Sequence, residues 1–238
     1  MTAAAKKIIP SAPANTNAGH RERLRDRFLS SGENALVEPE LLELILFYAI
    51  PRCDTKALAK ALLQSFGSLA GVLSARADNI AAISDLSETS ATLLKAVHAA
   101  ATRMGKTQVM NQQPALSNWE QLISYCHVAM AHVRTEQLRI LFLDKKNKLI
   151  ADEMQQVGTV DHTPAYPREI IKLALNLSAS AIIMVHNHPS GDPVPLRADI
   201  QLTDVVCDAA QTMGITLHDH IIIAKSAHYS FRAEGLIR

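Results

Sequence analysis

Five consecutive apolar residues, 181–185, restrict the fold of this chain more than any other stretch. A run of this length is typical of a buried strand rather than of a core helix. Residues 167–177 and 197–213, on either side, have helical patterns; the first begins with a proline and the second ends at Gly214. Because strands alternate with helices here, we predict an α/β or α+β sandwich.

The rest of this sandwich is expected on both sides of the buried strand. Residues 138–143 and 148–157 flank a polar turn and therefore predict a β-hairpin. Residues 215–224 and 229–231 predict two more strands, and residues 118–131 predict a helix ahead of the hairpin. We expect this domain to cover residues 118–238.

The first half of the chain has a helical pattern instead. Residues 1–19 are rich in Ala, Pro, Asn and Thr without periodicity and predict a disordered tail, and polar residues 106–117, with Pro114, predict a linker. Between them, residues 20–105 predict a small helical domain. Its helices are expected near residues 20–29, 41–46, 56–66, 69–73 and 91–104.

Composition narrows the class of protein. The three cysteines are far apart and form no CxxC pair, which argues against a thiolate metal site and a disulfide framework and favours a reducing cytoplasm. No apolar run reaches the ~18 residues of a membrane span, and no signal-peptide core follows the N-terminus. We therefore expect a soluble cytoplasmic protein with no membrane partner.

Two histidines follow the buried strand and suggest a metal site. His186 and His188 are two residues apart on an extended segment, so their imidazoles point to one face and can converge on one ion. A loop rich in Pro and Gly then leads to Asp199, in the first turn of the next helix. Two imidazoles and one carboxylate leave a fourth position open for water, as in catalytic zinc sites.

A second pair, His218 and His220, is the main rival for a metal site. It has no open loop and no nearby carboxylate at a suitable spacing. We therefore interpret His220 as a packed or hydrogen-bonded strand residue, while a contact with the ligands of the first site stays open.

The segment HNHPSGDP (186–193), followed by Asp199, resembles the zinc motif of the JAMM (MPN) metalloproteases. In detail it resembles the bacterial RadC family, named for a supposed role in DNA repair. The likeness extends over nearly the whole chain. It is carried further by GHRERLR (19–25), LLEL (41–44), FYAIP (47–51), FGSL (66–69) and YPRE (166–169). The resemblance implies a JAMM (MPN, cytidine-deaminase-like) sandwich preceded by a small all-α domain.

The resemblance also implies roles. The metal ligands of one Zn²⁺ would be His186, His188 and Asp199, and the catalytic base would be a glutamate at the start of the first strand, by position Glu136. The chain would then hydrolyse an amide or isopeptide bond of a peptide or protein substrate. Glu153 and Glu169 are the fallback candidates for the base. One departure stands out: the family motif has a serine, an oxyanion donor, where this chain has Leu196.

A DNA partner is the less supported expectation. The RadC N-terminal half resembles helix-hairpin-helix DNA binders, but residues 83–88 lack both hairpin glycines, and Asp85 would repel phosphate. The arginines at 21, 23, 25 and 27 are spread around a helix among acidic residues, which favours a solvated helix with ion pairs. The alternative function is a non-catalytic DNA- or protein-binding repair accessory with a structural zinc. The oligomeric state is not predicted.

Overall fold

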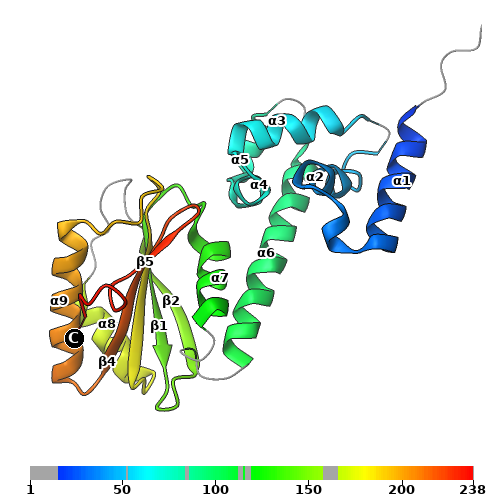
Figure 1. Cartoon of the computed structure of the whole chain (residues 1–238). Helices are drawn as coiled ribbons and strands as arrows, with labels where there is room; N and C mark the ends of the chain where they lie inside the picture. Colours follow the sequence, from blue (N-terminus) through cyan, green and yellow to red (C-terminus); the bar gives the residue numbers. More distant parts are fainter. Residues whose placement is uncertain are drawn as a thin grey trace, which may run out of the picture. The chain divides into compact units, whose positions relative to one another are not determined.

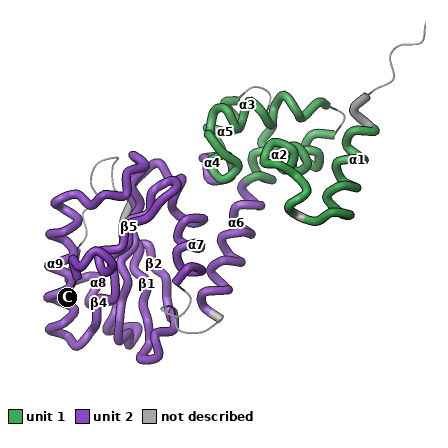
Figure 2. Tube along the Cα trace, viewed as in Figure 1, with its two compact units in different colours: residues 1–72, 76–94 green, residues 73–75, 95–238 purple. Residues whose placement is uncertain are grey.

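The computed structural model describes residues 16–51, 53–83, 86–111, 115, 119–157 and 166–237. The chain divides into two compact units (Figure 2). Unit 1 contains residues 1–72 and 76–94, and unit 2 contains residues 73–75 and 95–238. No described helix is long and apolar enough to cross a membrane.

Unit 1 is built from helices, and local sequence signals set the bounds of one of them. The helix α3 (Lys56–Phe66) begins where Asp54 Oδ1 accepts a hydrogen bond from the Lys56 N–H at 2.9 Å, and it ends at Gly67, whose φ is +84°. The other helical segments are α1 (Thr16–Ser31), η1 (Glu33–Ala35), α2 (Glu38–Leu46), α4 (Leu69–Ser74), α5 (Ala77–Ala81) and the start of α6 (Glu88–Asn111).

Two arginines of α1 are engaged inside unit 1. The Arg21 guanidinium donates to the carbonyls of Ile50 (2.7 Å) and Cys53 (2.5 Å), just beyond α2, and Arg27 pairs with Glu40 at 2.5 Å. The ion pair of Arg27 is thus formed with α2 rather than with an acidic residue of α1 itself. The degenerate hairpin at 83–88 lies partly outside the described residues.

The helix α6 enters the segment where the linker was expected, and residues 112–114 and 116–118 of that segment lie outside the described residues. It begins at Glu88, after Ser87, and continues to Asn111, so the first residues of the segment 106–117 are helical. Gly105 alone does not end a helix, since it costs only ~1 kcal/mol relative to alanine. The boundary between the two units falls inside α6, after Leu94. Residues 16–19 of the expected tail belong to α1, which begins at Thr16; residues 1–15 lie outside the described residues.

Unit 2 contains a mixed five-stranded sheet in the order β2-β1-β3-β4-β5 (Figure 1). Only β3 and β4 are parallel; the other neighbours are antiparallel. The strands are β1 (Gln137–Leu143), β2 (Leu149–Val157), β3 (Ala181–Asn187), β4 (Thr216–Ile223) and β5 (His228–Ser230). All seven residues of β3 are buried; the apolar pattern predicted this for residues 181–185, and the two polar residues that follow are buried as well. The mixed α+β fold confirms the predicted class.

Helices cover both faces of the sheet (Figure 1). The helix α7 (Trp119–Met130) packs on one face, and α8 (Pro167–Asn176) and α9 (Arg197–Thr212) pack on the other. Alternate residues of β3 serve the two faces: Ile183 and Val185 lie in the core beneath α7, and Ile182 and Met184 lie in the core beneath α8 and α9. By the same alternation, the last two residues of β3, His186 and Asn187, point to opposite faces of the sheet.

A buried ion pair lies on the α7 side of the sheet. The Asp152 carboxylate of β2 accepts two hydrogen bonds from Arg139 of β1, at 2.8 and 2.9 Å, and one from the Tyr125 hydroxyl of α7. Lys106 of α6 lies 3.7 Å from the same carboxylate. Burial, reinforced by the neighbouring carboxylate, raises the pKa of Tyr125, so the phenol stays protonated and donates. This cluster joins two strands and two helices.

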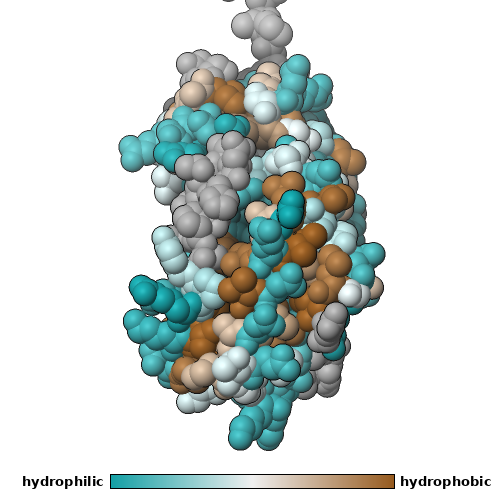
Figure 3. Space-filling view, turned by 90° about the vertical axis from the view of Figure 1, so that its left-hand side faces the viewer, coloured by the Kyte–Doolittle hydropathy of each residue, from teal (hydrophilic) through white to brown (hydrophobic). Residues whose placement is uncertain are grey.

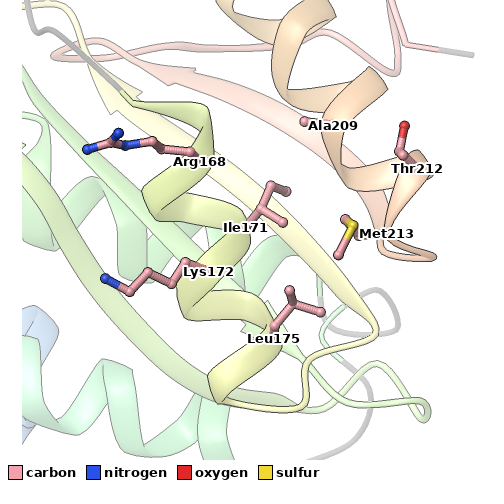
Figure 4. A pocket seen from close by; sticks show the side chains of 7 residues that line it. All are labelled: Arg168, Ile171, Lys172, Leu175, Ala209, Thr212 and Met213. Carbon is pink, nitrogen blue, oxygen red and sulfur yellow. The ribbon is translucent and has the colours of Figure 1, made fainter.

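A groove separates α8 from α9 on the opposite side. In Figure 4, Ile171, Leu175 and Met213 point toward one another across it, while Arg168 and Lys172 extend away. Brown, hydrophobic side chains are exposed among polar ones on the side of the molecule that Figure 3 presents. Leu175 and Met213 are each about half exposed.

Candidate metal centre

The three predicted ligands come together at the end of β3. The strand continues two residues further than predicted, because His186 pairs with Leu138 of β1 and with Ile222 of β4. His188 follows the strand and points the same way, so the two Nε2 atoms lie 2.9 Å apart. Asp199 completes the group: its oxygens lie 3.4 Å from His186 Nε2 and 3.5 Å from His188 Nε2. The ligand atoms all lie within 4.8 Å of one another.

A short loop returns the chain to the site. The His188 N–H donates to the carbonyl of Ile223 at 2.9 Å, and Gly191, with φ of +92°, lets the chain turn directly afterwards. Asp199 is the third residue of α9, and its Oδ2 accepts the N–H of Leu196 at 2.7 Å. The N-terminal end of a helix favours a negative charge, so an ionised carboxylate is stabilised at this position.

Hydrogen bonds decide which nitrogen of His188 can bind a metal. His188 Nδ1 lies 2.8 Å from the carbonyl oxygen of Asp192. A carbonyl has no hydrogen to give, so the proton must be on Nδ1. The lone pair of the neutral ring is therefore on Nε2, the atom that faces His186 and Asp199.

On the side away from the other two ligands, the His186 ring contacts a series of buried, hydrogen-bonded groups. Its Nδ1 lies 2.8 Å from His220 Nε2, and His220 Nδ1 lies 2.6 Å from the Thr203 hydroxyl. That hydroxyl donates to the backbone carbonyl of Asp199 at 2.6 Å. The His220 ring is fully buried and stacks on Phe231, with 4.6 Å between ring centroids.

The sequence left open the contact between His220 and the first site, and the structure shows it. Thr203 was missed altogether. A signal was present, since Thr203 follows Asp199 by four residues and therefore lies on the same helix face.

The electrostatics suit a bound cation. Burial lowers the pKa of His186 to about 4, so this imidazole is neutral at physiological pH. Burial also acts against the charged form of His188, but Asp199, the Asp192 carbonyl and Glu136 together raise the pKa of His188. Burial tends to raise the pKa of Asp199, but the two histidines hold it below its usual value. An ionised carboxylate and the neutral imidazole of His186 thus face one point, and the negative charges that raise the pKa of His188 also favour a cation there.

This donor set fits zinc. Ligands at the usual ~2.0–2.1 Å from a tetrahedral zinc lie about 3.3 Å apart, close to the separations of 2.9–3.5 Å between the three side chains. The structure thus brings together the residues predicted to bind the metal. The half-buried rival His218 points elsewhere: its Nε2 lies 2.8 Å from Asn147 Oδ1.

Glu136 lies in the segment just before β1, and Asn187 fixes this segment beside the histidines. The fully buried Asn187 side chain accepts the Gln137 N–H at 2.9 Å and donates to the carbonyls of Val133 and Thr135, each at 3.2 Å. These groups flank Glu136 on both sides. Its charge acts on the pKa of His188, which places the carboxylate in electrostatic range of the metal group. Asn187 was not singled out from the sequence.

The fallback candidates lie outside the cluster of ligand atoms. Glu153 is exposed on β2, and Glu169 forms ion pairs with Arg168 (3.2 Å) and Lys172 (3.4 Å) in the first turn of α8. Leu196 is 56% exposed just before α9, and its N–H is engaged by Asp199. The Ser190 hydroxyl oxygen accepts the Asp192 N–H at 3.4 Å.

Comparison with known proteins agrees with this geometry. The family model described as a RadC-like JAB domain matches residues 116–236, which include β1 to β5 and the whole metal centre. A protein of Rhodobacter capsulatus that is named only as a UPF0758 protein is 55% identical over 214 residues, which cover 90% of this chain and all of the relative. The chain therefore belongs to the RadC family, and its second half is a JAB domain.

Proposed function

We propose that this protein is a zinc-dependent hydrolase that cleaves an amide or isopeptide bond in a peptide or protein. The observation that carries the proposal is the convergence of two imidazoles and one carboxylate beside a second, anchored carboxylate. Structural zinc sites are closed by four protein ligands, whereas three ligands leave a position for water or substrate. The described residues offer three ligands here.

Each residue has a distinct task in this proposal. His186, His188 and Asp199 hold the ion, which when bound polarises the scissile carbonyl and makes water a better nucleophile at neutral pH. Glu136 accepts the proton of the attacking water and passes it to the leaving amine, the usual work of a positioned carboxylate. The anchor at Asn187 keeps Glu136 in place while its charge changes.

Leu196 sets the expected rate. It has no hydrogen-bond donor in its side chain, and its backbone N–H is directed at Asp199. Loss of one oxyanion donor costs on the order of 10²–10³ in rate. We therefore propose that this protein hydrolyses its substrate more slowly than a family member that has the motif serine.

Metal content and hydrolysis test the proposal together. We expect about one zinc per chain by mass spectrometry, lost in His188→Ala and in Asp199→Ala, and peptide-library cleavage that Glu136→Gln abolishes while zinc is retained. Absence of zinc after reloading at neutral pH would refute the proposal. Zinc binding without cleavage, in the parent and in Leu196→Ser, would favour the non-catalytic alternative. Salt-dependent DNA affinity would then identify its nucleic-acid form.

A further inference from the structure

We infer that Thr203 and His220 are positioning residues that fix the tautomer of His186, so that its Nε2 always presents a lone pair to the metal. We call these two residues the relay. The consequence for metal binding rests on the zinc function proposed above. The hydrogen-bond pattern itself does not depend on any metal.

The first step of the relay is set by a backbone carbonyl. The Thr203 hydroxyl oxygen lies 2.6 Å from the carbonyl oxygen of Asp199, and two oxygens approach this closely only with a hydrogen between them. The carbonyl has none, so the hydroxyl donates its single hydrogen there. Toward His220 the same oxygen can then only accept, and His220 Nδ1, 2.6 Å away, must carry a hydrogen.

The second step transfers this constraint to His186. Complete burial disfavours a charged His220, so a ring with its proton on Nδ1 has a lone pair on Nε2. His186 Nδ1 lies 2.8 Å from His220 Nε2, which has this lone pair, and must therefore donate. The only form of neutral His186 that satisfies this contact has its lone pair on Nε2, facing His188 and Asp199.

Burial makes the arrangement hard to replace. Thr203 is 1% exposed, His220 0% and His186 7%, which leaves little access for solvent water to substitute for a lost partner. Stacking on Phe231 and the pairing of β4 with β3 hold the His220 ring in place. Asp199 thus acts twice, because its carboxylate faces the metal position while its backbone carbonyl starts the relay.

Removal of the hydroxyl reverses the constraint. In Thr203→Val, which keeps the β-branched shape, His220 Nδ1–H loses its acceptor, and the ring is expected to move its proton to Nε2. His186 Nδ1 must then accept, and its own proton moves to Nε2, where it blocks the metal. Thr203→Ser keeps the hydroxyl and is the matched control. Partners of this kind typically contribute 10- to 100-fold to metal affinity.

The experiment has two readouts. In the metal-free protein at about pH 8.5, above the usual histidine pKa, imidazole ¹⁵N–¹H spectra should show His186 and His220 protonated at Nδ1 in the parent and in Thr203→Ser. Thr203→Val should shift both protons to Nε2. In competition with a chromogenic chelator, Thr203→Val should bind Zn²⁺ 10- to 100-fold more weakly than the parent, with Thr203→Ser within about threefold of it.

The outcomes separate the two proposals. A parent that binds no zinc but has both protons on Nδ1 would refute the hydrolase and leave the relay standing. Protonation of His220 at Nε2 in the parent would overturn the relay, and this spectrum needs no variant to fold. Equal zinc affinity of parent and Thr203→Val would also overturn it, because a merely structural Thr203 would change thermal stability alone.

Discussion

Replacement of Asn187 with alanine should release the segment that contains Glu136. The substitution removes three hydrogen bonds to the backbone of Val133, Thr135 and Gln137, all made by a side chain with no solvent exposure. At about 1 kcal/mol each, the segment loses about 3 kcal/mol of resistance to local opening. This corresponds to a roughly 100-fold larger population of the open form.

Trypsin can measure this opening directly. Arg134 is exposed and lies inside the anchored segment, so cleavage after Arg134 should accelerate by roughly 100-fold in Asn187→Ala when opening is faster than cleavage. The matched control is Leu122→Ala: Leu122 is fully buried in α7, and its truncation costs ~2–5 kcal/mol of global stability. Equal cleavage rates after Arg134 in the two variants, at similar stability in urea, would refute the anchoring role of Asn187.

Three other predictions follow from the structure. Leu196→Ser should stabilise the protein by about 1 kcal/mol as a helix N-cap and raise peptide cleavage by about 10²-fold; a gain in stability without a gain in rate would remove the oxyanion role. Arg139→Met, which deprives the buried Asp152 carboxylate of its main partner, should cost about 3 kcal/mol in urea unfolding, and an unchanged midpoint would contradict this. Burial lowers the pKa of His98, so the unfolded chain binds a proton that the folded chain does not; unfolding free energy should therefore fall as pH drops below about 6.5, less steeply in His98→Gln.

Local signals were enough for much of the fold. The predicted range 56–66 matches α3 at both ends because Asp54, which accepts the Lys56 N–H, and Gly67 mark these ends in the sequence. The end of β3 was predicted two residues early. Apolar character stops at Val185, but the strand continues because His186 still pairs with Leu138 of β1 and with Ile222 of β4. Strand ends are set by partners as well as by composition.

The convergence of the three expected metal ligands was predicted, whereas Asn187 and Thr203 were not singled out and the contact of His220 was left open, for a physical reason. His186, His188 and Asp199 lie within fourteen residues, so local geometry and a loop are sufficient to bring them together. Asn187 acts on a segment about fifty residues earlier in the chain, and His220 reaches His186 only through the parallel register of β3 and β4. Long-range register cannot be read from a single sequence.

The alternation of side chains at the end of β3 has a consequence for tolerated insertions and deletions. His186 points toward α9 and Asn187 toward the segment after α7, so a shift of one residue would exchange their sides. A single insertion or deletion in β3 would therefore abolish both the metal centre and the hydrogen bonds of Asn187 to the segment before β1. A length change in the turn at 144–147 would leave both intact. Natural variation in length should therefore be concentrated in the turns, and a graft of this site into another scaffold must include residues 133–137.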